Sequence, residues 1–183
     1  RETAELAVHA GLTGHLVLST LHTNNAIGVV PRLLDMGAEP FLLGSTLNVI
    51  VAQRLLRRIC VDCKVKEELS LEAGKSIAAD LKQLTPEIMI AYNVTIADPP
   101  IFYKGSGCGK CGGTGKRGRV AIAEVVEVTP AVRQIISVGA PETEMRNALQ
   151  TQGFLTLRQS GLIKALLGLI TLEDVLISTK EGS

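Results

Sequence analysis

The sequence predicts an α/β fold that carries a metal-binding insert and a helical C-terminal subdomain. The unbroken apolar run Leu16-Val17-Leu18 is typical of a strand covered on both faces in a parallel sheet. All four cysteines fall into two Cys-x-x-Cys pairs, a spacing typical of metal sites. After residue 129, cap residues and glycines recur at the spacing expected of four short helices. These three features predict a core, an insert and a tail.

Polar side chains crowd the far end of the predicted strand. They are Ser19, Thr20, His22, Thr23 and Asn24. Open parallel sheets bind ligands outside the carboxyl ends of their strands, so we expect a ligand-facing loop here. Histidines near a strand end are also common as hydrogen-bonded core or surface residues. The spacing of His15 and His22 alone is compatible with that structural role as well.

Composition limits the classes of protein to consider. With 46% hydrophobic residues and a mean hydropathy of +0.28, the 183-residue chain can bury one good core with a small satellite unit. A net charge of +1 gives no global field for a polyanion, and 3% aromatic residues give no pattern for stacking nucleic-acid bases. No apolar run reaches the roughly 18 residues of a membrane span. The absence of a signal-peptide pattern favours the cytoplasm, and the start without Met predicts a fragment.

Two short helices are predicted around the strand. Residues 2–10 predict a helix that leads into it. After the strand, Asn24 or Asn25 can cap a second helix. Pro31 is expected to kink or restart that helix, because a proline inside a helix costs about 3 kcal/mol. Gly37 is expected to end it with a left-handed cap.

Pro40 is predicted to open a third helix over residues 41–59. Arg54, Arg57 and Arg58 would then lie near its C-terminal end, where cations oppose the helix dipole. Two interpretations of these arginines are open. They can form a solvated helix end, or one of them, with Arg54 as the candidate, can meet a nucleotide phosphate or a neighbouring subunit.

The two cysteine pairs predict a structural zinc site. Cys60 with Cys63 and Cys108 with Cys111 each offer two thiolates in one tight turn, and residues 64–107 separate the pairs. Two such turns complete a tetrahedral site that has no open position, so the metal would hold structure without activating water. Disulfides and scattered free thiols are the alternatives, and disulfides are disfavoured in a cytosolic chain.

The remaining sequence predicts short elements on both sides of the second cysteine pair. Within the insert we expect two helices and a returning strand, at residues 70–84, 86–92 and 101–103. A strand over residues 118–128 should rejoin the main sheet. Four helices then follow, at residues 130–139, 141–152, 155–167 and from 171 onward.

Gly14 to Asn24 resembles the histidine box of the secretion ATPases, the motor proteins of type II secretion and type IV pilus assembly. Glu2-Thr3-Ala4 resembles the end of that family's Walker B region, and the two cysteine pairs resemble its tetracysteine insert. The resemblance implies a partial RecA-like P-loop NTPase core. Residues 1–59 and 118–129 would form the C-terminal half of that core, 60–117 the metal-binding insert and 130–183 the helical tail.

The same resemblance implies roles for individual residues. His22 would hydrogen-bond or sense the γ-phosphate of ATP, and Thr20 and Thr23 would help to position the loop. His15 would be structural or would couple to the Walker B segment. His22 and His15 are therefore the candidate catalytic residues, and Thr20, Thr23 and Arg54 are the candidate nucleotide-binding residues.

The resemblance also implies what lies outside these residues. No Gly-x-x-x-x-Gly-Lys-Ser/Thr loop is present, so the fragment should bind nucleotide poorly and hydrolyse none alone. The full-length protein, with ATP and Mg²⁺, would be a cytoplasmic homo-hexamer docked on an inner-membrane platform protein, without inserting into the membrane. The tetracysteine insert favours pilus assembly or secretion over retraction.

Two other functions are compatible with parts of the sequence. The cysteines with Lys110, Lys116, Arg117 and Arg119 could form a zinc ribbon that binds nucleic acid. The remaining chain argues against this, because a zinc ribbon needs neither the predicted strand with its histidines nor a helical tail. A docking module without catalysis is the second alternative.

Overall fold

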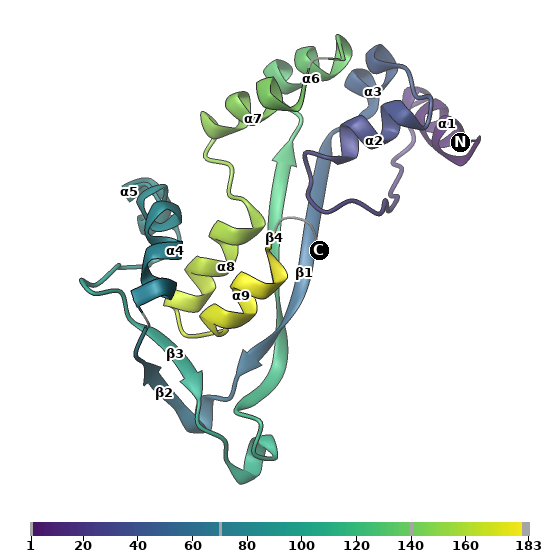
Figure 1. Cartoon of the computed structure of the whole chain (residues 1–183). Helices are drawn as coiled ribbons and strands as arrows, with labels where there is room; N and C mark the ends of the chain where they lie inside the picture. The colour runs from purple at the N-terminus through teal and green to yellow at the C-terminus, as the bar shows by residue number, and fades with distance from the viewer. Residues whose placement is uncertain (1, 70, 140, 181–183) are drawn as a thin grey trace. The chain divides into compact units, whose positions relative to one another are not determined.

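The computed structural model describes residues 2–69, 71–139 and 141–180 (Figure 1). The chain divides into two compact units, each described here by itself. The first unit comprises Arg1–Ala52 with Glu124–Phe154, and the second comprises Gln53–Ala123 with Leu155–Ser183. The predicted helix start at Ser70, and the chain ends at Arg1 and 181–183, lie outside the described residues. Among the described helices, none combines the length and apolar character needed to cross a membrane.

Two small sheets contain the strands of the described chain. β1 (Val49–Ile59) pairs with β4 (Lys116–Glu127), which confirms the strand predicted over residues 118–128. Its predicted return to a main sheet is wrong, because its partner β1 lies in residues predicted to be helical. β2 (Lys64–Glu67) pairs antiparallel with β3 (Phe102–Gly105), which confirms the predicted returning strand. The mixture of helices and strands confirms an α/β fold.

The first unit is mainly helical. Its helices are α1 (Glu2–Leu12), α2 (Val29–Asp35), α3 (Pro40–Thr46), α6 (Pro130–Ser137) and α7 (Glu142–Gln150). Their apolar faces pack against the start of β1 and the end of β4, the parts of these strands that belong to the first unit, and together they form one core. Its fully buried members include Ala26, Leu43, Val126 and Val132. Gly44 lets α3 and α6 approach closely, because a Cβ there would lie 1.9 Å from the Ser137 hydroxyl oxygen.

The predicted interruption at Pro31 is wrong. α2 begins at Val29, so Pro31 occupies the first helical turn, where its missing N–H has no intrahelical partner to lose. The predicted cap at Asn24 or Asn25 is wrong, because Gly28 occupies the N-cap position. Asn25 instead stabilises the turn before the helix, where its Oδ1 accepts a hydrogen bond from the Gly28 amide at 2.7 Å. The predicted cap at Gly37 is confirmed. Its φ is +92°, and its backbone N–H donates a hydrogen bond to the Leu34 carbonyl at 2.8 Å.

The predicted strand at residues 16–18 is also wrong. Residues 15–23 form neither helix nor strand, and Leu16 and Leu18 are 86% and 88% exposed. A strand buried on both faces needs a neighbouring strand on each side to bond its backbone. Among the described strands, β1 pairs with β4 and β2 with β3, so the apolar run has no sheet to join.

The long helix predicted over residues 41–59 is wrong beyond its first two turns. Pro40 does open α3, but α3 ends at Thr46 and β1 follows after two residues. The β-branched run Val49-Ile50-Val51 favours a strand, and burial along β1 alternates as a strand requires. Arg54, Arg57 and Arg58 therefore lie on a strand, and the helix-dipole argument does not apply to them.

The second unit combines the β2–β3 ladder with the helices α4 (Leu71–Lys82), α5 (Pro86–Ala91), α8 (Leu157–Leu166) and α9 (Leu172–Ser178). These bounds confirm the two helices predicted in the insert. α8 holds α4 through polar contacts as well as apolar packing. Arg158 Nε donates to Asp80 Oδ2 at 2.7 Å, and Gln159 Nε2 donates to Gln83 Oε1 at 3.1 Å. A small apolar cluster around Leu84, Val94 and Ile163 completes the contact.

All four predicted tail helices are present, and they are shared between the units. α6 and α7 belong to the first unit, and α8 and α9 to the second. The predicted stops at Gly139 and Gly168 have φ values of +65° and +66°. The predicted cap of α9 is confirmed, because Thr171 Oγ1 accepts from the Asp174 amide at 3.2 Å.

Candidate metal centre

The β2–β3 ladder brings the two cysteine pairs together. Cys60 is the N-cap of the short 3₁₀ turn η1 (Val61–Cys63), and Cys63 is the last residue of that turn, which leads into β2. Cys108 and Cys111 lie at η2 (Gly109–Cys111), shortly after β3 ends. The ladder pairs Lys64 with Gly105, so the end of one cysteine turn lies opposite the approach to the other.

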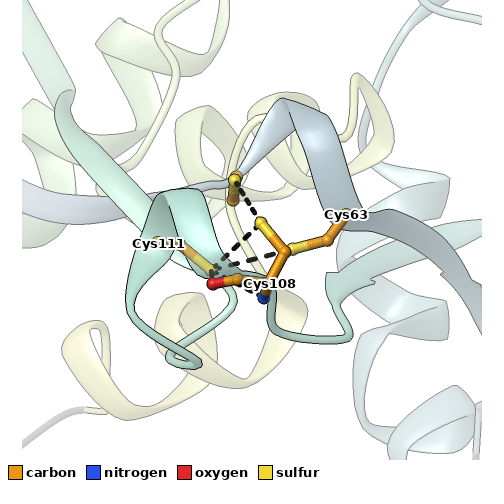
Figure 2. A group of neighbouring side chains, drawn as sticks. Cys63, Cys108 and Cys111 are labelled. Carbon is orange, nitrogen blue, oxygen red and sulfur yellow. Dashed lines mark hydrogen bonds between the residues drawn. The ribbon is translucent and has the colours of Figure 1, made fainter.

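The four sulfur atoms form one cluster. Cys60 Sγ lies 3.9 Å from Cys108 Sγ, Cys63 Sγ lies 3.9 Å from Cys111 Sγ, and Cys108 and Cys111 Sγ are 3.7 Å apart. All four lie within 4.8 Å of one another, and Figure 2 shows the labelled side chains converging on one point. A tetrahedron with bonds of about 2.3 Å to zinc has sulfur–sulfur edges of about 3.8 Å. The thiols are free, and the cluster could hold one metal ion.

Two glycines allow the backbones to cross beside the cluster. A Cβ on Gly105 would lie 2.0 Å from the Gly115 carbonyl oxygen, and a Cβ on Gly115 would lie 2.4 Å from the Gly105 oxygen. Gly115 also has a φ of +69°, a conformation that side chains disfavour. The crossing lets the Cys60 amide donate to the Gly115 carbonyl at 2.9 Å, which ties the two cysteine turns together.

Backbone amides distinguish the cysteines electrostatically. The Cys108 and Gly115 amides each donate to Cys111 Sγ at 3.2 Å, and these bonds lower the pKa of the Cys111 thiol to about 6. Loss of solvent, with neighbouring thiols, raises the pKa of Cys63 to about 11. One thiolate therefore forms readily while its neighbour resists a second negative charge. A divalent cation at the centre would remove that conflict.

An ion pair joins the two cysteine turns on the outside of the cluster. Lys110 Nζ lies 2.6 Å from Asp62 Oδ1, and this hydrogen bond lowers the pKa of the Asp62 carboxyl and raises that of the Lys110 amine. Both side chains are solvent-accessible, so the pair contributes little to stability. It instead orients η1 against η2.

Two segments that flank the cysteine turns contact α9 and the residues just before it. The Ile59 amide, next to Cys60, donates to the Leu169 carbonyl at 2.9 Å. Lys116 Nζ contacts both carboxylate oxygens of Asp174 in the first turn of α9, at 2.8 and 2.6 Å. The two cysteine turns are thus held by contacts with α9 and with the α8–α9 connection as well as by the β2–β3 ladder.

Four of the five predicted nucleotide residues belong to the first unit. His15, Thr20, His22 and Thr23 share the irregular segment that follows α1 in the first unit, and both histidines are exposed. His15 Nδ1 lies 3.0 Å from Thr13 Oγ1, and Thr23 Oγ1 donates to the Asn25 carbonyl at 3.0 Å. These four predicted residues share one short segment because they are close in the sequence.

The fifth predicted residue, Arg54, belongs to the other unit of the chain. It is half-buried on β1 and belongs to the second unit. Its predicted contact with a nucleotide phosphate is untested by this geometry.

One buried acidic residue escaped the sequence analysis. Glu124 on β4 is 4% exposed, and its Oε1 accepts a hydrogen bond from the Ala26 amide. The signal was present in the sequence. Glu124 occupies an inward position of an alternating strand, two residues before the buried Val126, where an apolar residue is expected.

Comparison with known proteins identifies the family. The family model described as type II/IV secretion system protein matches residues 1–177. This chain belongs to the type II/IV secretion system protein family. Type II secretion system protein E from Pseudomonas aeruginosa is 44% identical to this family member over 181 residues, which cover 99% of the chain and 33% of that protein. The type IV pilus assembly ATPase PilB from Thermus thermophilus is 41% identical over 180 residues, which cover 98% of the chain and 19% of that protein.

A solved structure has a similar fold. The crystal structure of the pilus retraction motor PilT with bound ADP matches this secretion-family chain with a TM-score of 0.59 at 24% identity, covering 99% of the chain and 37% of PilT. At that identity the match concerns the fold. The chain spans about a third or less of the length of the curated relatives named above.

Proposed function

We propose that this chain is the C-terminal part of a hexameric motor ATPase that powers type II secretion or type IV pilus assembly. The family match over residues 1–177 carries the proposal. Relatives at 41–44% identity are named as a type II secretion protein E and a pilus assembly ATPase. Within this proposal, residues 1–59 and 118–129 are the C-terminal half of a RecA-like core, 60–117 the insert and 130–183 the tail.

The histidine segment is the proposed nucleotide-facing part of the chain. His22 would act on the γ-phosphate, with Thr20 and Thr23 positioning the loop and His15 supporting it. Both histidines are exposed and therefore accessible to a ligand. The exposed apolar run at residues 16–18 supports the same proposal, because strands supplied by the rest of the motor would cover it. ATP and Mg²⁺ would be held mainly by a phosphate loop that these 183 residues lack.

The proposed ligand of the cysteine cluster is one structural Zn²⁺. Four thiolates at tetrahedral spacing suit zinc, and they leave no position for a reacting water. The ion would close the turns at η1 and η2, and it would take no part in ATP hydrolysis. From the family we also propose that the full-length protein forms a homo-hexamer in the cytoplasm. It would contact an inner-membrane platform protein.

Steady-state ATP hydrolysis by the full-length protein tests the proposal. His22→Ala should lower kcat by tenfold or more, because loss of one positioned polar group at a phosphate costs about that much. His9→Ala is the matched control, since His9 is an exposed histidine on α1 without an assigned role. Wild-type protein without ATPase activity, or equal activities of the two variants, would contradict the proposal.

The nucleic-acid-binding and docking alternatives are not favoured. Family membership extends over both units, so the cysteine cluster is not an isolated zinc ribbon. Lys110 and Lys116, two of the four basic residues of that alternative, pair with Asp62 and Asp174.

A further inference from the structure

β4 carries an acidic side chain on its buried face. Near the end of the strand, Val126 is fully buried while its neighbours Val125 and Glu127 are exposed. Glu124 continues the inward-facing series and is 4% exposed. Burying a carboxyl group is costly unless it is hydrogen-bonded, so a core position of this kind needs a compensating contact.

That contact reaches the end of the histidine segment. The Ala26 amide, four residues after His22, donates to Glu124 Oε1 in the core of the first unit. Two further bonds fix the same stretch, from Thr23 Oγ1 to the Asn25 carbonyl at 3.0 Å and from the Gly28 amide to Asn25 Oδ1 at 2.7 Å. Residues 15–22, just before it, form no helix or strand.

We propose that Glu124 is a positioning residue for His22. Its carboxylate holds the Ala26 amide and so fixes the point where the histidine segment enters α2. Asn25 and Thr23 are local to the segment, whereas Glu124 ties it to a strand about a hundred residues later in the chain. The inference rests on the proposed function, because His22 has its nucleotide role there.

Two variants of the full-length protein test the contact itself. Glu124→Met removes the acceptor at nearly constant size, and Glu124→Gln retains an oxygen in the same place. Hydrogen exchange followed by mass spectrometry should show residues 23–28 exchanging about tenfold faster in E124M and near the wild-type rate in E124Q. Unchanged exchange in E124M would overturn the proposal.

Kinetics test whether the contact acts through His22. E124M should lower kcat for ATP about tenfold with a change in KM of less than about twofold, and E124Q should restore most of kcat. The double variant H22A/E124M should be no slower than H22A alone, because both changes remove the same action. Additive losses would overturn the proposal.

A core variant separates positioning from general destabilisation. Val132→Ala removes a fully buried side chain in the same core and should lower Tm, yet leave kcat and exchange at residues 23–28 unchanged. An equal loss of kcat in V132A would show that Glu124 matters only for stability. If wild-type protein hydrolyses no ATP, the proposed function fails, while the exchange measurement still judges the contact.

Discussion

At the scale of single residues, Gly115 determines how closely the two cysteine turns approach. Gly115→Ala would place a methyl group 2.4 Å from the Gly105 carbonyl oxygen in a backbone with φ +69°. We expect a loss of about 2 kcal/mol or more in free energy of unfolding and weaker zinc retention against a chelator.

Gly109→Ala is the matched control for this prediction. Gly109 lies in the cysteine turn η2, shortly before Gly115, and a Cβ there would meet no atom within 4 Å. Its zinc retention and thermal unfolding should stay at the wild-type level. Equal effects of the two alanines would show that the backbone crossing does not shape the site.

The thiols of the cluster should differ in reactivity once metal is removed. At pH 7 a Cys111 thiol with a pKa of about 6 is mostly thiolate, whereas a Cys63 thiol with a pKa of about 11 is protonated. Since the thiolate is the nucleophile, iodoacetamide should modify Cys111 before Cys63. Peptide mass spectrometry over a short time course measures this order, and faster labelling of Cys63 would refute it.

The residue types of the metal cluster could be predicted because the spacing of thiolates carries the chemistry. Two Cys-x-x-Cys pairs predict a tetrahedral site whatever sequence lies between them, here formed by Cys60, Cys63, Cys108 and Cys111. The alternation of β4 marks Glu124 as an inward-facing residue, but its hydrogen bond could not be found from the sequence. Its partner is a backbone amide at Ala26, and no side-chain pattern in the sequence marks a backbone donor.

At the scale of elements, the helix starts at Pro40 and Thr171 and the stop at Gly37 were predictable, whereas the start of α2 and the helix–strand boundary after Thr46 were not. Pro40, Gly37 and Thr171 act through the local backbone, so their effects can be read from neighbouring residues. The apolar residues of β1 also fit a helical spacing. Hydrogen bonding with β4, which lies far along the chain, favours a strand over a helix at these residues.

Packing between α8 and α9 gives a test at this scale. A Cβ on Gly161 would lie 2.7 Å from Val175 Cγ1, and Val175 is fully buried and β-branched. Gly161→Ala should therefore lower the free energy of unfolding by about 1–3 kcal/mol in a denaturant titration.

The same substitution on α4 should have the opposite sign. A Cβ on Gly74 would meet nothing within 4 Å, and α4 is an ordinary helix there. Gly74→Ala should stabilise by about 0.5–1 kcal/mol, because alanine loses less backbone entropy in a helix. Destabilisation by both alanines would contradict this account of α8–α9 packing.

At the scale of the whole molecule, the structure of two stretches could not be predicted from their own residues, because it depends on segments elsewhere in the protein. Residues 64–107 carried no functional motif, and in the structure they contain the β2–β3 ladder that brings the cysteine turns together, with α4 and α5 between its strands. The apolar run at residues 16–18 was predicted as a strand because the pattern assumes neighbouring strands. The strands described in this chain are already paired with one another.

Metal removal should act on one unit more than on the other. The cysteines and the β2–β3 ladder belong to the second unit, and the first unit has its own core around Leu43 and Val126. A strong chelator should speed hydrogen exchange in β2 and β3 by at least about tenfold while α3 and α6 remain protected. Uniform acceleration in both units would contradict this expectation.

The central structural claim is that two cysteine pairs, separated by residues 64–107, close one metal site with four thiolates. X-ray absorption at the zinc edge of the purified full-length protein tests it most directly. We predict one zinc per chain with four sulfur neighbours at about 2.3 Å. Substoichiometric zinc, or a first shell that contains nitrogen or oxygen, would contradict the claim.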